Sequence, residues 1–226
     1  MTMVAELSPV MEGVRRAAAL TPDEMKRMVD AAPVEPRGMR DAAMVALGYS
    51  CALRRSEIAA LDVEDLRMVV GGRTPVPRQG EDPVDPGARC LVRIRRSKTD
   101  QAGRGYDIPL EEGSRLRPLQ LLQWWLIEAR ITHGPLFRAI RGHEVQAGRI
   151  QGHDVDRAVK RLAAAAGVDV EPLSAHSLRS GFITAAVEAG ADLDQVMKVS
   201  RHKSYESVLD YVRRRDLFRD YAGTFL

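Results

Sequence analysis

The sequence predicts a mainly α-helical fold with one small antiparallel β-sheet, in the α+β class. Two observations predict it. Apolar residues recur at helical spacing before residue 62 and again after residue 115, and they alternate with polar residues in short segments between residues 66 and 110. The chain has 226 residues, 45% hydrophobic and 29% charged, so it can bury a sizeable core. This composition excludes the collagen-like and disordered classes.

The first helix is predicted to begin at Thr21–Glu24, whose Thr-Pro-Asp-Glu sequence has the form of a capping box with proline at the first helical position. Pro33 and Pro36 are expected to end this helix. The apolar run Met39–Leu53 predicts a second, central helix, and a short third helix is expected over Ser56–Leu61.

After a turn over residues 62–66, strands are predicted at residues 66–70, 90–95 and 106–110. The connection at residues 71–88 holds four glycines and four prolines in 18 residues, so it is longer than a tight hairpin needs. Helical spacing then returns, with Ser174 as N-cap and Gly190 as C-terminal stop of one helix. The five helices predicted there are Leu116–Ala129, Val155–Ala166, Ala175–Glu188, Leu193–Val199 and Tyr205–Arg213.

The positive charge is concentrated in the second part of the chain. Residues 1–90 hold 12 Lys and Arg against 14 Asp and Glu, a net charge of −2, and residues 91–226 hold 22 against 17, a net charge of +5. Arginine outnumbers lysine 29 to 5, which favours planar, bidentate contacts to phosphate. A GC-rich coding sequence would produce the same bias, and the two explanations weigh equally.

Cysteine usage and the N-terminal segment indicate the cellular compartment. Cys51 and Cys90 lie in apolar contexts, are expected to be buried thiols, and cannot build a disulfide framework or a zinc site. The first 14 residues lack the basic and apolar regions of a signal peptide, and no 18-residue apolar run is present. We therefore expect a cytoplasmic protein with no membrane partner.

Four short segments carry polar residues in patterns that packing alone does not require. Each has a bland explanation when taken singly: a surface salt bridge, a solvated turn, or chance. The pair His176 and Arg179 lies near a predicted helix N-terminus, where backbone N–H groups also favour an anion. The four are Leu53-Arg54-Arg55-Ser56-Glu57-Ile58, Lys98 at the tip of a predicted hairpin, His176-Ser177-Leu178-Arg179, and His202 followed by Tyr211.

In this order, these residues are similar to the catalytic motifs of the tyrosine recombinases, the phage integrase family of site-specific DNA recombinases. The resemblance extends over about residues 20–221, and it includes the spacing of 23 residues from Arg179 to His202 and of nine residues from His202 to Tyr211. A single His-x-x-Arg is common by chance, whereas the complete ordered series is highly specific. The resemblance implies the catalytic-domain fold of that family.

The resemblance implies roles for the residues that cleave DNA. Arg54 and Arg179 would clamp the scissile phosphate and stabilise its pentavalent transition state. Tyr211 would be the nucleophile that forms a 3′-phosphotyrosyl link and leaves a free 5′-hydroxyl. Lys98 would be the general acid that protonates the departing 5′ oxygen.

The resemblance also implies roles for three assisting residues and for the partners. His176 and His202 would hydrogen-bond the phosphate and assist proton transfer from the tyrosine, and Glu57 would orient Arg54. No cofactor and no metal are expected, because the phosphotyrosyl link stores the bond energy. The expected partners are double-stranded DNA, other copies of the chain in a homo-tetramer on DNA, and accessory DNA-bending proteins. We expect a monomer without DNA, and association with the nucleoid when DNA is bound.

The sequence departs from the family pattern at two positions. Arg201 stands where the family usually has glycine before the second histidine, and it either adds a cation near the phosphate or contacts the backbone. Ala52 takes the place of a glycine before Leu53. Tyr205 and Tyr221 are alternatives to Tyr211, one too close to His202 and the other too distant for the family spacing.

The remaining histidines and tryptophans are assigned no role in catalysis. His133, His143 and His153 have no motif around them and are expected on the surface or in loops. Trp124 and Trp125 lie on an apolar predicted helix, and we expect them in the core and in an interface instead of stacking on bases.

The expected domain organisation is one catalytic domain with a short segment before it. Residues 1–19 are interpreted as a linker or the remnant of an upstream core-binding domain, and residues 20–226 as the catalytic domain. Its C-terminal segment, residues 215–226, has an apolar face that packs either in cis or on a neighbouring subunit. With half of the usual DNA clamp missing, we expect weak, salt-sensitive DNA binding.

The sequence leaves the biological role open. A phage or genomic-island integrase is favoured, while integration, excision, dimer resolution and transposition all stay possible. A type IB topoisomerase-like or resolving enzyme is an alternative with the same chemistry. A non-catalytic DNA-binding or regulatory derivative is the alternative from another class, and the complete set of six catalytic positions argues against it.

Overall fold

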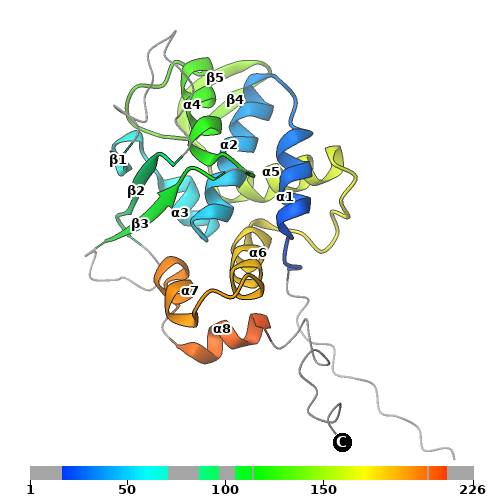
Figure 1. Ribbon diagram of the computed structural model, residues 1–226. Coiled ribbons are helices and arrows are strands. Elements are labelled where there is room, and N and C mark those ends of the chain that lie inside the picture. The colour runs from blue at the N-terminus through cyan, green and yellow to red at the C-terminus, as the bar shows by residue number, and fades with distance from the viewer. Residues whose placement is uncertain (1–16, 71–86, 97–104, 114, 203, 213–226) are drawn as a thin grey trace, which may run out of the picture.

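The computed structural model describes residues 17–70, 87–96, 105–113, 115–202 and 204–212 (Figure 1). Lys98, Tyr221, most of the connection at 71–88 and the segment 215–226 lie outside these residues, as does most of the N-terminal segment. The described chain is mainly helical with two small antiparallel sheets, which confirms the predicted fold class. Among the described residues, no helix is long and apolar enough to cross a membrane.

The first helix, α1 (Pro22–Asp30), begins at the predicted capping box. The Thr21 hydroxyl accepts a hydrogen bond from the Glu24 backbone N–H at 3.2 Å, and the Glu24 carboxylate accepts one from the Thr21 N–H at 2.8 Å. These two bonds satisfy amide groups that have no partner inside the helix. The local sequence therefore determines this helix start.

The central helix, α2 (Pro36–Ser50), begins and ends three residues before the positions expected for it. Pro36 opens this helix instead of ending the previous one, because proline has no N–H to lose in a first turn. The helix ends early because Ala52 has a left-handed backbone with φ of +47°, which reverses the chain into α3 (Arg55–Ala60).

The predicted three-stranded sheet is confirmed as β1 (Leu66–Val70), β2 (Arg89–Ile94) and β3 (Tyr106–Glu111), antiparallel in the order β1-β2-β3. Cys90 pairs with Leu110 and with Met68 across the two ladders. Alternate residues of β2 are buried, including Cys90, whereas the residues between them are partly or fully exposed. One face of the sheet thus covers the core, as period-two patterning requires.

A second sheet, the hairpin β4 (Arg138–Arg141) and β5 (Glu144–Arg149), was not predicted. Its strands are short, arginine-rich and without buried alternation, so they carry no period-two signal. Contacts distant in sequence hold the hairpin in place: Arg149 Nη1 donates to the Ala59 carbonyl at 3.0 Å and to the Leu61 carbonyl at 2.8 Å.

The five later helices are present as predicted, and Ser174 caps α6 by accepting a hydrogen bond from the His176 N–H at 3.2 Å. Gly190, with φ of +84°, follows the end of α6, a conformation that glycine adopts without a steric penalty. The helices are α4 (Pro118–Glu128), α5 (Gly152–Ala165), α6 (Ala175–Glu188), α7 (Leu193–Ser200) and α8 (Tyr205–Val212).

Two apolar clusters hold the helices together. The main cluster surrounds α2 and includes residues of α4, α5 and the three-stranded sheet. A small second cluster of Ile183, Val196 and Val208 packs α7 and α8 against α6. In Figure 1, α7 and α8 lie at the lower end of the molecule, next to α6. The second cluster is joined to the main one, because Phe182 packs against both and Val199 of α7 packs against the main cluster.

The structure separates the two adjacent tryptophans. Trp125 is fully buried, and its indole N–H donates to the Leu136 carbonyl at 2.9 Å, so the expectation of a core residue is correct for it. Trp124 is 50% exposed and lines an apolar groove of about 750 Å³ with Val34 and Leu121, so a core position is wrong for it. The helical period places neighbouring residues about 100° apart, and on α4 this turns Trp125 towards the core and Trp124 towards the groove.

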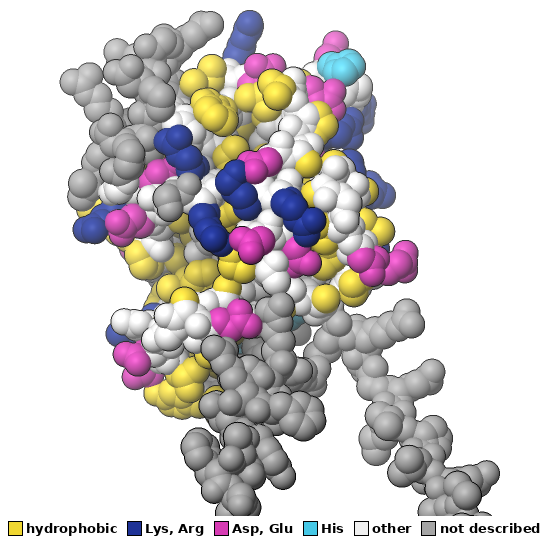
Figure 2. Space-filling view, turned by 45° about the vertical axis from the view of Figure 1, so that its right-hand side comes forward, with side chains coloured by type: hydrophobic (Ala, Val, Ile, Leu, Met, Phe, Trp, Pro, Cys, Tyr) yellow, Lys and Arg dark blue, Asp and Glu magenta, His cyan; other side chains and the backbone are white. Residues whose placement is uncertain are grey.

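The cysteine and histidine expectations are confirmed. Cys51 and Cys90 are buried free thiols, and burial raises the pKa of both. His133, His143 and His153 are exposed. On the face shown in Figure 2, basic and acidic side chains are interspersed among the described residues, so the net positive charge does not form a broad patch there.

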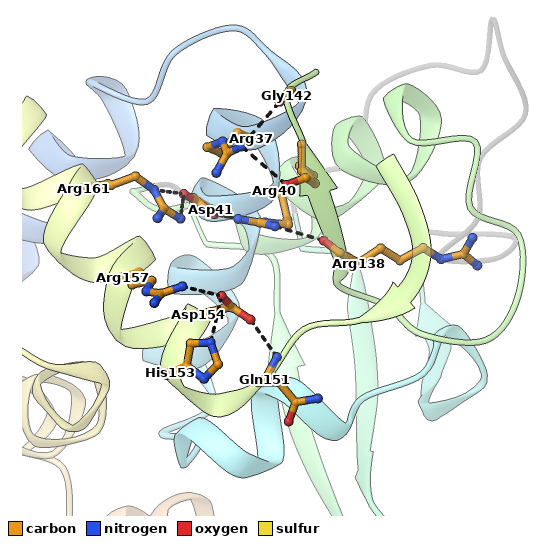
Figure 3. Close-up of polar contacts among 11 residues, drawn as sticks. Arg37, Arg40, Asp41, Arg138, Gly142, Gln151, His153, Asp154, Arg157 and Arg161 are labelled. Carbon is orange, nitrogen blue, oxygen red and sulfur yellow. Dashed lines mark hydrogen bonds and ion pairs between the residues drawn. The ribbon is translucent and has the colours of Figure 1, made fainter. Parts of the chain in front are cut away.

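A buried ionic cluster joins α2 to α5 and to the β4–β5 hairpin (Figure 3). Asp41, 1% exposed, accepts from Arg40 at 2.8 and 3.1 Å and from Arg161 at 2.6 and 2.9 Å. Arg40 also donates to the Arg138 carbonyl of β4 at 3.0 Å. One buried carboxylate thus pairs with two guanidinium groups, that of Arg40 buried and that of Arg161 partly exposed.

Asp41→Ala is expected to lower the free energy of unfolding by about 3 to 5 kcal/mol, because it leaves the buried Arg40 guanidinium without a counter-charge. Urea denaturation measures this change. Asp154→Ala is the matched control, since Asp154 is partly exposed and caps α5 by accepting from the Gln151 N–H at 2.8 Å (Figure 3). Its loss should cost about 1 kcal/mol. Equal destabilisation by both variants would contradict the prediction.

Candidate active site

Three segments that are far apart in the sequence meet at one place, and each contributes residues that the motifs singled out. Arg54 precedes α3, His176 and Arg179 lie in the first turns of α6, and His202 lies between α7 and α8. The charges of Arg54, Arg179, His176 and Arg201 all act on the His202 imidazole. The fold therefore brings together Arg54, His176, Arg179 and His202 of the predicted set.

Arg54 is held by the buried carboxylate of Glu57. Glu57 Oε1 accepts from Arg54 Nη1 at 2.8 Å, and Oε2 accepts from the Arg54 backbone N–H at 2.8 Å. The Glu57 side chain is 1% exposed and the Arg54 side chain 23% exposed. The guanidinium thus keeps an accessible part while one of its nitrogens is anchored, which is the orienting contact that the sequence predicted between these two residues.

Arg179 is buried, with 2% of its surface exposed, and its guanidinium is held at both ends. Nη1 donates to the Ala52 carbonyl at 2.7 Å, at the left-handed turn that follows α2. Nη2 lies 3.4 Å from His202 Nε2. Because an arginine has only donors, Nε2 of His202 is the acceptor in this contact.

The contacts of His202 determine its tautomer. Ser200 Oγ lies 2.9 Å from His202 Nδ1. Since Nε2 faces the arginine donor, the ring proton is on Nδ1 and is donated to the serine hydroxyl. Burial lowers the pKa of His202 to about 4, and the charges of Arg179, Arg54, His176 and Arg201 act in the same direction. His202 is therefore neutral near pH 7, and the lone pair of Nε2 faces Arg179.

The N-terminus of α6 differs from the expected anion site. The N–H of Ala175 donates to Asp156 Oδ1 at 2.8 Å, and the N–H of His176 donates to the Ser174 hydroxyl at 3.2 Å. The N–H of Ser177 donates to the Ser174 carbonyl at 2.9 Å. Because protein acceptors already occupy these three amides, side chains and not helix amides are left to hold an anion here. His176 itself is exposed.

The structure describes less of the two remaining predicted residues, Tyr211 and Lys98. Tyr211 lies on α8, nine residues after His202, and its side chain is outside the described part of the structure. Lys98 lies outside the described residues altogether. Tyr205, the alternative nucleophile, is 50% exposed. Its hydroxyl donates a hydrogen bond to the Asp194 carboxylate, and this bond raises the pKa of the phenol. A raised pKa makes a tyrosine a poorer nucleophile.

Sequence reasoning missed the role of Ser200 and left that of Arg201 undecided. Arg201 has a left-handed backbone, φ +58° and ψ 37°, and ends α7 in the conformation that usually favours glycine. Its guanidinium is 7% exposed, and Nη2 lies 2.5 Å from Glu57 Oε2. Nη1 also donates to the Val199 carbonyl at 2.8 Å, a contact with the protein's own backbone. The sequence feature that could have indicated Ser200 is a hydroxyl residue placed two positions before His202.

The low pKa of His202 predicts a pH dependence of stability. The unfolded imidazole titrates at 6.5 and the folded one at about 4, so the unfolded state binds the proton first. The contribution of neutral His202 is fully present above pH 6.5 and is lost as the pH falls towards 4. Urea denaturation across this range should show a smaller loss of stability for His202→Asn than for the wild type. The exposed-site control His153→Asn should follow the wild type, and identical curves for all three proteins would contradict the prediction.

Comparison with known proteins agrees with these motifs. The family model described as "Phage integrase family" matches residues 18–217. An integrase/recombinase xerD homolog of Selenomonas ruminantium is 31% identical over 188 residues, which cover 82% of this chain and 50% of the relative. A tyrosine recombinase XerD of Xanthomonas axonopodis pv. citri is 29% identical over 219 residues, 91% of this chain and 62% of the relative. The chain thus spans about half the length of the curated relatives it matches.

Solved structures share the fold at low identity. The XerH site-specific recombinase bound to palindromic difH substrate has a TM-score of 0.66 at 16% identity, over 92% of this chain and 53% of that chain. The lambda integrase catalytic core has a TM-score of 0.52 at 19% identity, over 80% of this chain and 93% of that chain. Together with the family match over residues 18–217, these findings show that the chain belongs to the phage integrase family of tyrosine recombinases.

Proposed function

We propose that this chain is the catalytic part of a site-specific DNA recombinase that breaks and rejoins strands through a 3′-phosphotyrosyl intermediate at Tyr211. The observation that carries the proposal is the meeting of Arg54, Arg179 and His202 from three separate segments, each held by its own protein contact. Such preorganised groups suit a phosphate whose charge increases in the transition state.

The two arginines supply a clamp for the scissile phosphate. Each guanidinium is anchored by a protein acceptor, Arg54 by Glu57 and Arg179 by the Ala52 carbonyl. Anchoring removes much of the side-chain entropy that binding would otherwise cost. Burial lowers the pKa of His202, and the charges of Arg179 and Arg54 lower it further. A phosphodiester placed there adds negative charge, which raises the pKa of His202 towards its ordinary value.

In the proposed reaction one phosphorus–oxygen bond forms, another breaks, and two protons move. The Tyr211 oxygen attacks phosphorus, its proton passes to His176 or His202, and the bond between phosphorus and the 5′ oxygen breaks. Lys98 gives a proton to that oxygen. In the reverse step a 5′-hydroxyl attacks the phosphotyrosine and releases Tyr211. The role of His202 is supported by its neutral form near pH 7, and those of His176 and Lys98 by the family resemblance.

The proposed partner is double-stranded DNA, and we propose that several copies of the chain assemble on it. This proposal is supported by lambda integrase, which has been solved as a dimer bound to a COC′ core site and as a tetramer bound to a Holliday junction. We further propose that residues 20–226 form the catalytic domain and that residues 1–19 link it to an upstream core-binding domain.

Covalent trapping tests the proposed function. The protein is incubated at low salt with a library of nicked duplexes of randomised sequence, from which a cleaved end diffuses away and cannot be rejoined. We expect an adduct that survives denaturation and whose nucleotide mass maps to Tyr211. The absence of an adduct, or an adduct on Tyr205, would overturn the proposal. Relaxation of supercoiled plasmid without joining of paired sites would instead indicate a topoisomerase-like activity.

A further inference from the structure

The unit formed by α7 and α8 carries His202 and Tyr211, whereas Arg54 belongs to the segment between α2 and α3. The α7–α8 unit packs on α6 through its own small apolar cluster, and Val199 of α7 also packs against the main core that contains α2 and α3. Figure 1 shows the two helices at the end of the molecule beside α6. The alignment of the nucleophile with the arginine clamp therefore depends on α6, on the packing of Val199 against the main core, and on the polar links between the α7–α8 unit and the α2–α3 segment.

Arg201 makes the principal link of this kind among the described residues. Its Nη2 lies 2.5 Å from Glu57 Oε2 of α3, and both side chains are buried, 7% and 1% exposed. Nη1 lies 3.5 Å from the Cys51 carbonyl, and Nη2 lies 3.5 Å from the Ala52 carbonyl, at the end of α2. The same Ala52 carbonyl accepts from Arg179 at 2.7 Å. One side chain thus joins the end of α7 to both α2 and α3.

We propose that Arg201 is a positioning residue, which through Glu57 aligns the α7–α8 unit with Arg54 for attack on the phosphate. The catalytic consequence of this inference rests on the proposed function. The structural link between Arg201 and Glu57 is independent of the proposed function and can be measured without DNA.

The charge balance around Glu57 gives the first reason. The carboxylate is shared, because Oε1 accepts from Arg54 and Oε2 accepts from Arg201. Two guanidinium groups and one carboxylate leave a net positive charge beside the phosphate position. Without Arg201, Glu57 and Arg54 form a neutral pair, and the carboxylate draws the Arg54 guanidinium away from an incoming anion.

The backbone of Arg201 gives the second reason. A side chain with a Cβ is disfavoured at φ +58°, and glycine adopts this conformation freely. The N–H of Arg201 donates to the Met197 carbonyl at 2.7 Å, so the left-handed turn is also the end of α7. An arginine that occupies this strained position, with its guanidinium buried against Glu57, indicates a contribution from the side chain that glycine would not make.

Arg201→Gly removes the side chain without disturbing the backbone, because glycine fits the left-handed turn. The variant should therefore fold. Arg130→Gly is the matched control: Arg130 is also an arginine with a left-handed backbone, φ +51°, and it is exposed. Single-turnover formation of the covalent adduct is followed at saturating DNA, together with DNA affinity. We expect Arg201→Gly to slow adduct formation by about 10- to 100-fold, the range for loss of an orienting contact, with little change in affinity.

Arg201→Lys should recover part of the rate, since it restores the charge without the two-pronged geometry. Arg130→Gly should react at the wild-type rate. Wild-type reaction of Arg201→Gly at saturating DNA would overturn the catalytic part of the inference. A loss confined to DNA affinity would also overturn it, since that outcome indicates an ordinary phosphate contact.

Hydrogen exchange of the DNA-free protein tests the link independently. Arg201→Gly should accelerate amide exchange in residues 193–209, with α2 unchanged, whereas Arg130→Gly should not. Unchanged exchange in α7 and α8 would overturn the structural link. If the wild type forms no covalent adduct, the proposed function fails, and the exchange experiment still decides whether Arg201 holds the α7–α8 unit in place.

Discussion

Tyr211→Phe is expected to form no covalent adduct with nicked DNA, because the variant lacks the oxygen that attacks phosphorus. Tyr205→Phe is expected to form as much adduct as the wild type. The two tyrosines lie on the same helix, α8, and differ in their spacing from His202 and in their surroundings. The measurement is the amount of denaturation-resistant protein–DNA complex after a fixed time with nicked duplexes in excess.

The structure explains why Tyr205 is not expected to replace Tyr211. The Tyr205 hydroxyl donates to the Asp194 carboxylate, and this bond and the negative charge of Asp194 raise the pKa of the phenol. A nucleophilic tyrosine needs the opposite surroundings, with cations and a proton acceptor nearby. Cations lie around His202, where burial and then the charges of Arg179 and Arg54 lower the pKa of the imidazole.

The pair of variants carries its own control. Equal thermal unfolding temperatures for Tyr211→Phe and Tyr205→Phe would show that neither change disrupts α8. Adduct formed by Tyr211→Phe would exclude Tyr211 as the nucleophile. Loss of the adduct in Tyr205→Phe alone would assign the reaction to the other tyrosine and overturn the spacing argument.

Arg179→Lys is expected to lower the rate of adduct formation by about 10³- to 10⁵-fold, the effect typical of losing an arginine that stabilises a phosphoryl transition state. This corresponds to about 4 to 7 kcal/mol of transition-state stabilisation. The lysine keeps the positive charge, so the loss of rate measures the contribution of the guanidinium geometry and not that of the charge. Single-turnover rates at saturating DNA give the measurement.

The geometric reason is the two-ended contact of the guanidinium. Arg179 Nη1 donates to the Ala52 carbonyl at 2.7 Å, while Nη2 faces His202 Nε2 at 3.4 Å. A lysine ammonium is a single point and cannot anchor to the carbonyl and face the phosphate and the histidine together. Because Arg179 is 2% exposed, the substitution also removes a buried donor from Ala52.

Arg157→Lys is the control for this substitution, since Arg157 is 67% exposed and pairs with Asp154 on α5. It should react at the wild-type rate and unfold at the wild-type temperature. A rate for Arg179→Lys within tenfold of the wild type would contradict a role for the guanidinium fork at the phosphate.

Local sequence signals predicted much of the fold. The capping box at Thr21 opens α1, Ser174 caps α6, and the alternation in β2 buries the face that it predicts. Each of these depends on residues within one helical turn or one strand, so a short window of sequence contains the whole cause. The hairpin β4–β5 has no such local cause, because its position depends on Arg149 and on carbonyl groups about 90 residues earlier.

The candidate site divides in the same way. Ordered motifs and their spacing identified Arg54, His176, Arg179, His202 and Tyr211 as one set, and the link between Arg54 and Glu57 is local because three residues of helix bring the two together. The sequence had no means to show that Arg201 contacts Glu57, 144 residues earlier, or that Arg179 is bonded to the Ala52 carbonyl, 127 residues earlier.

The sequence by itself determined the fold class, the family and the candidate catalytic set. Helix caps and strand alternation are properties of neighbouring residues, and the order and spacing of the motifs are properties of the chain before it folds. Only the tertiary structure decided the protonation state of His202, the buried position of Arg201 and the partners that hold the two arginines. Those properties depend on desolvation and on charges from segments that meet only when the chain is folded.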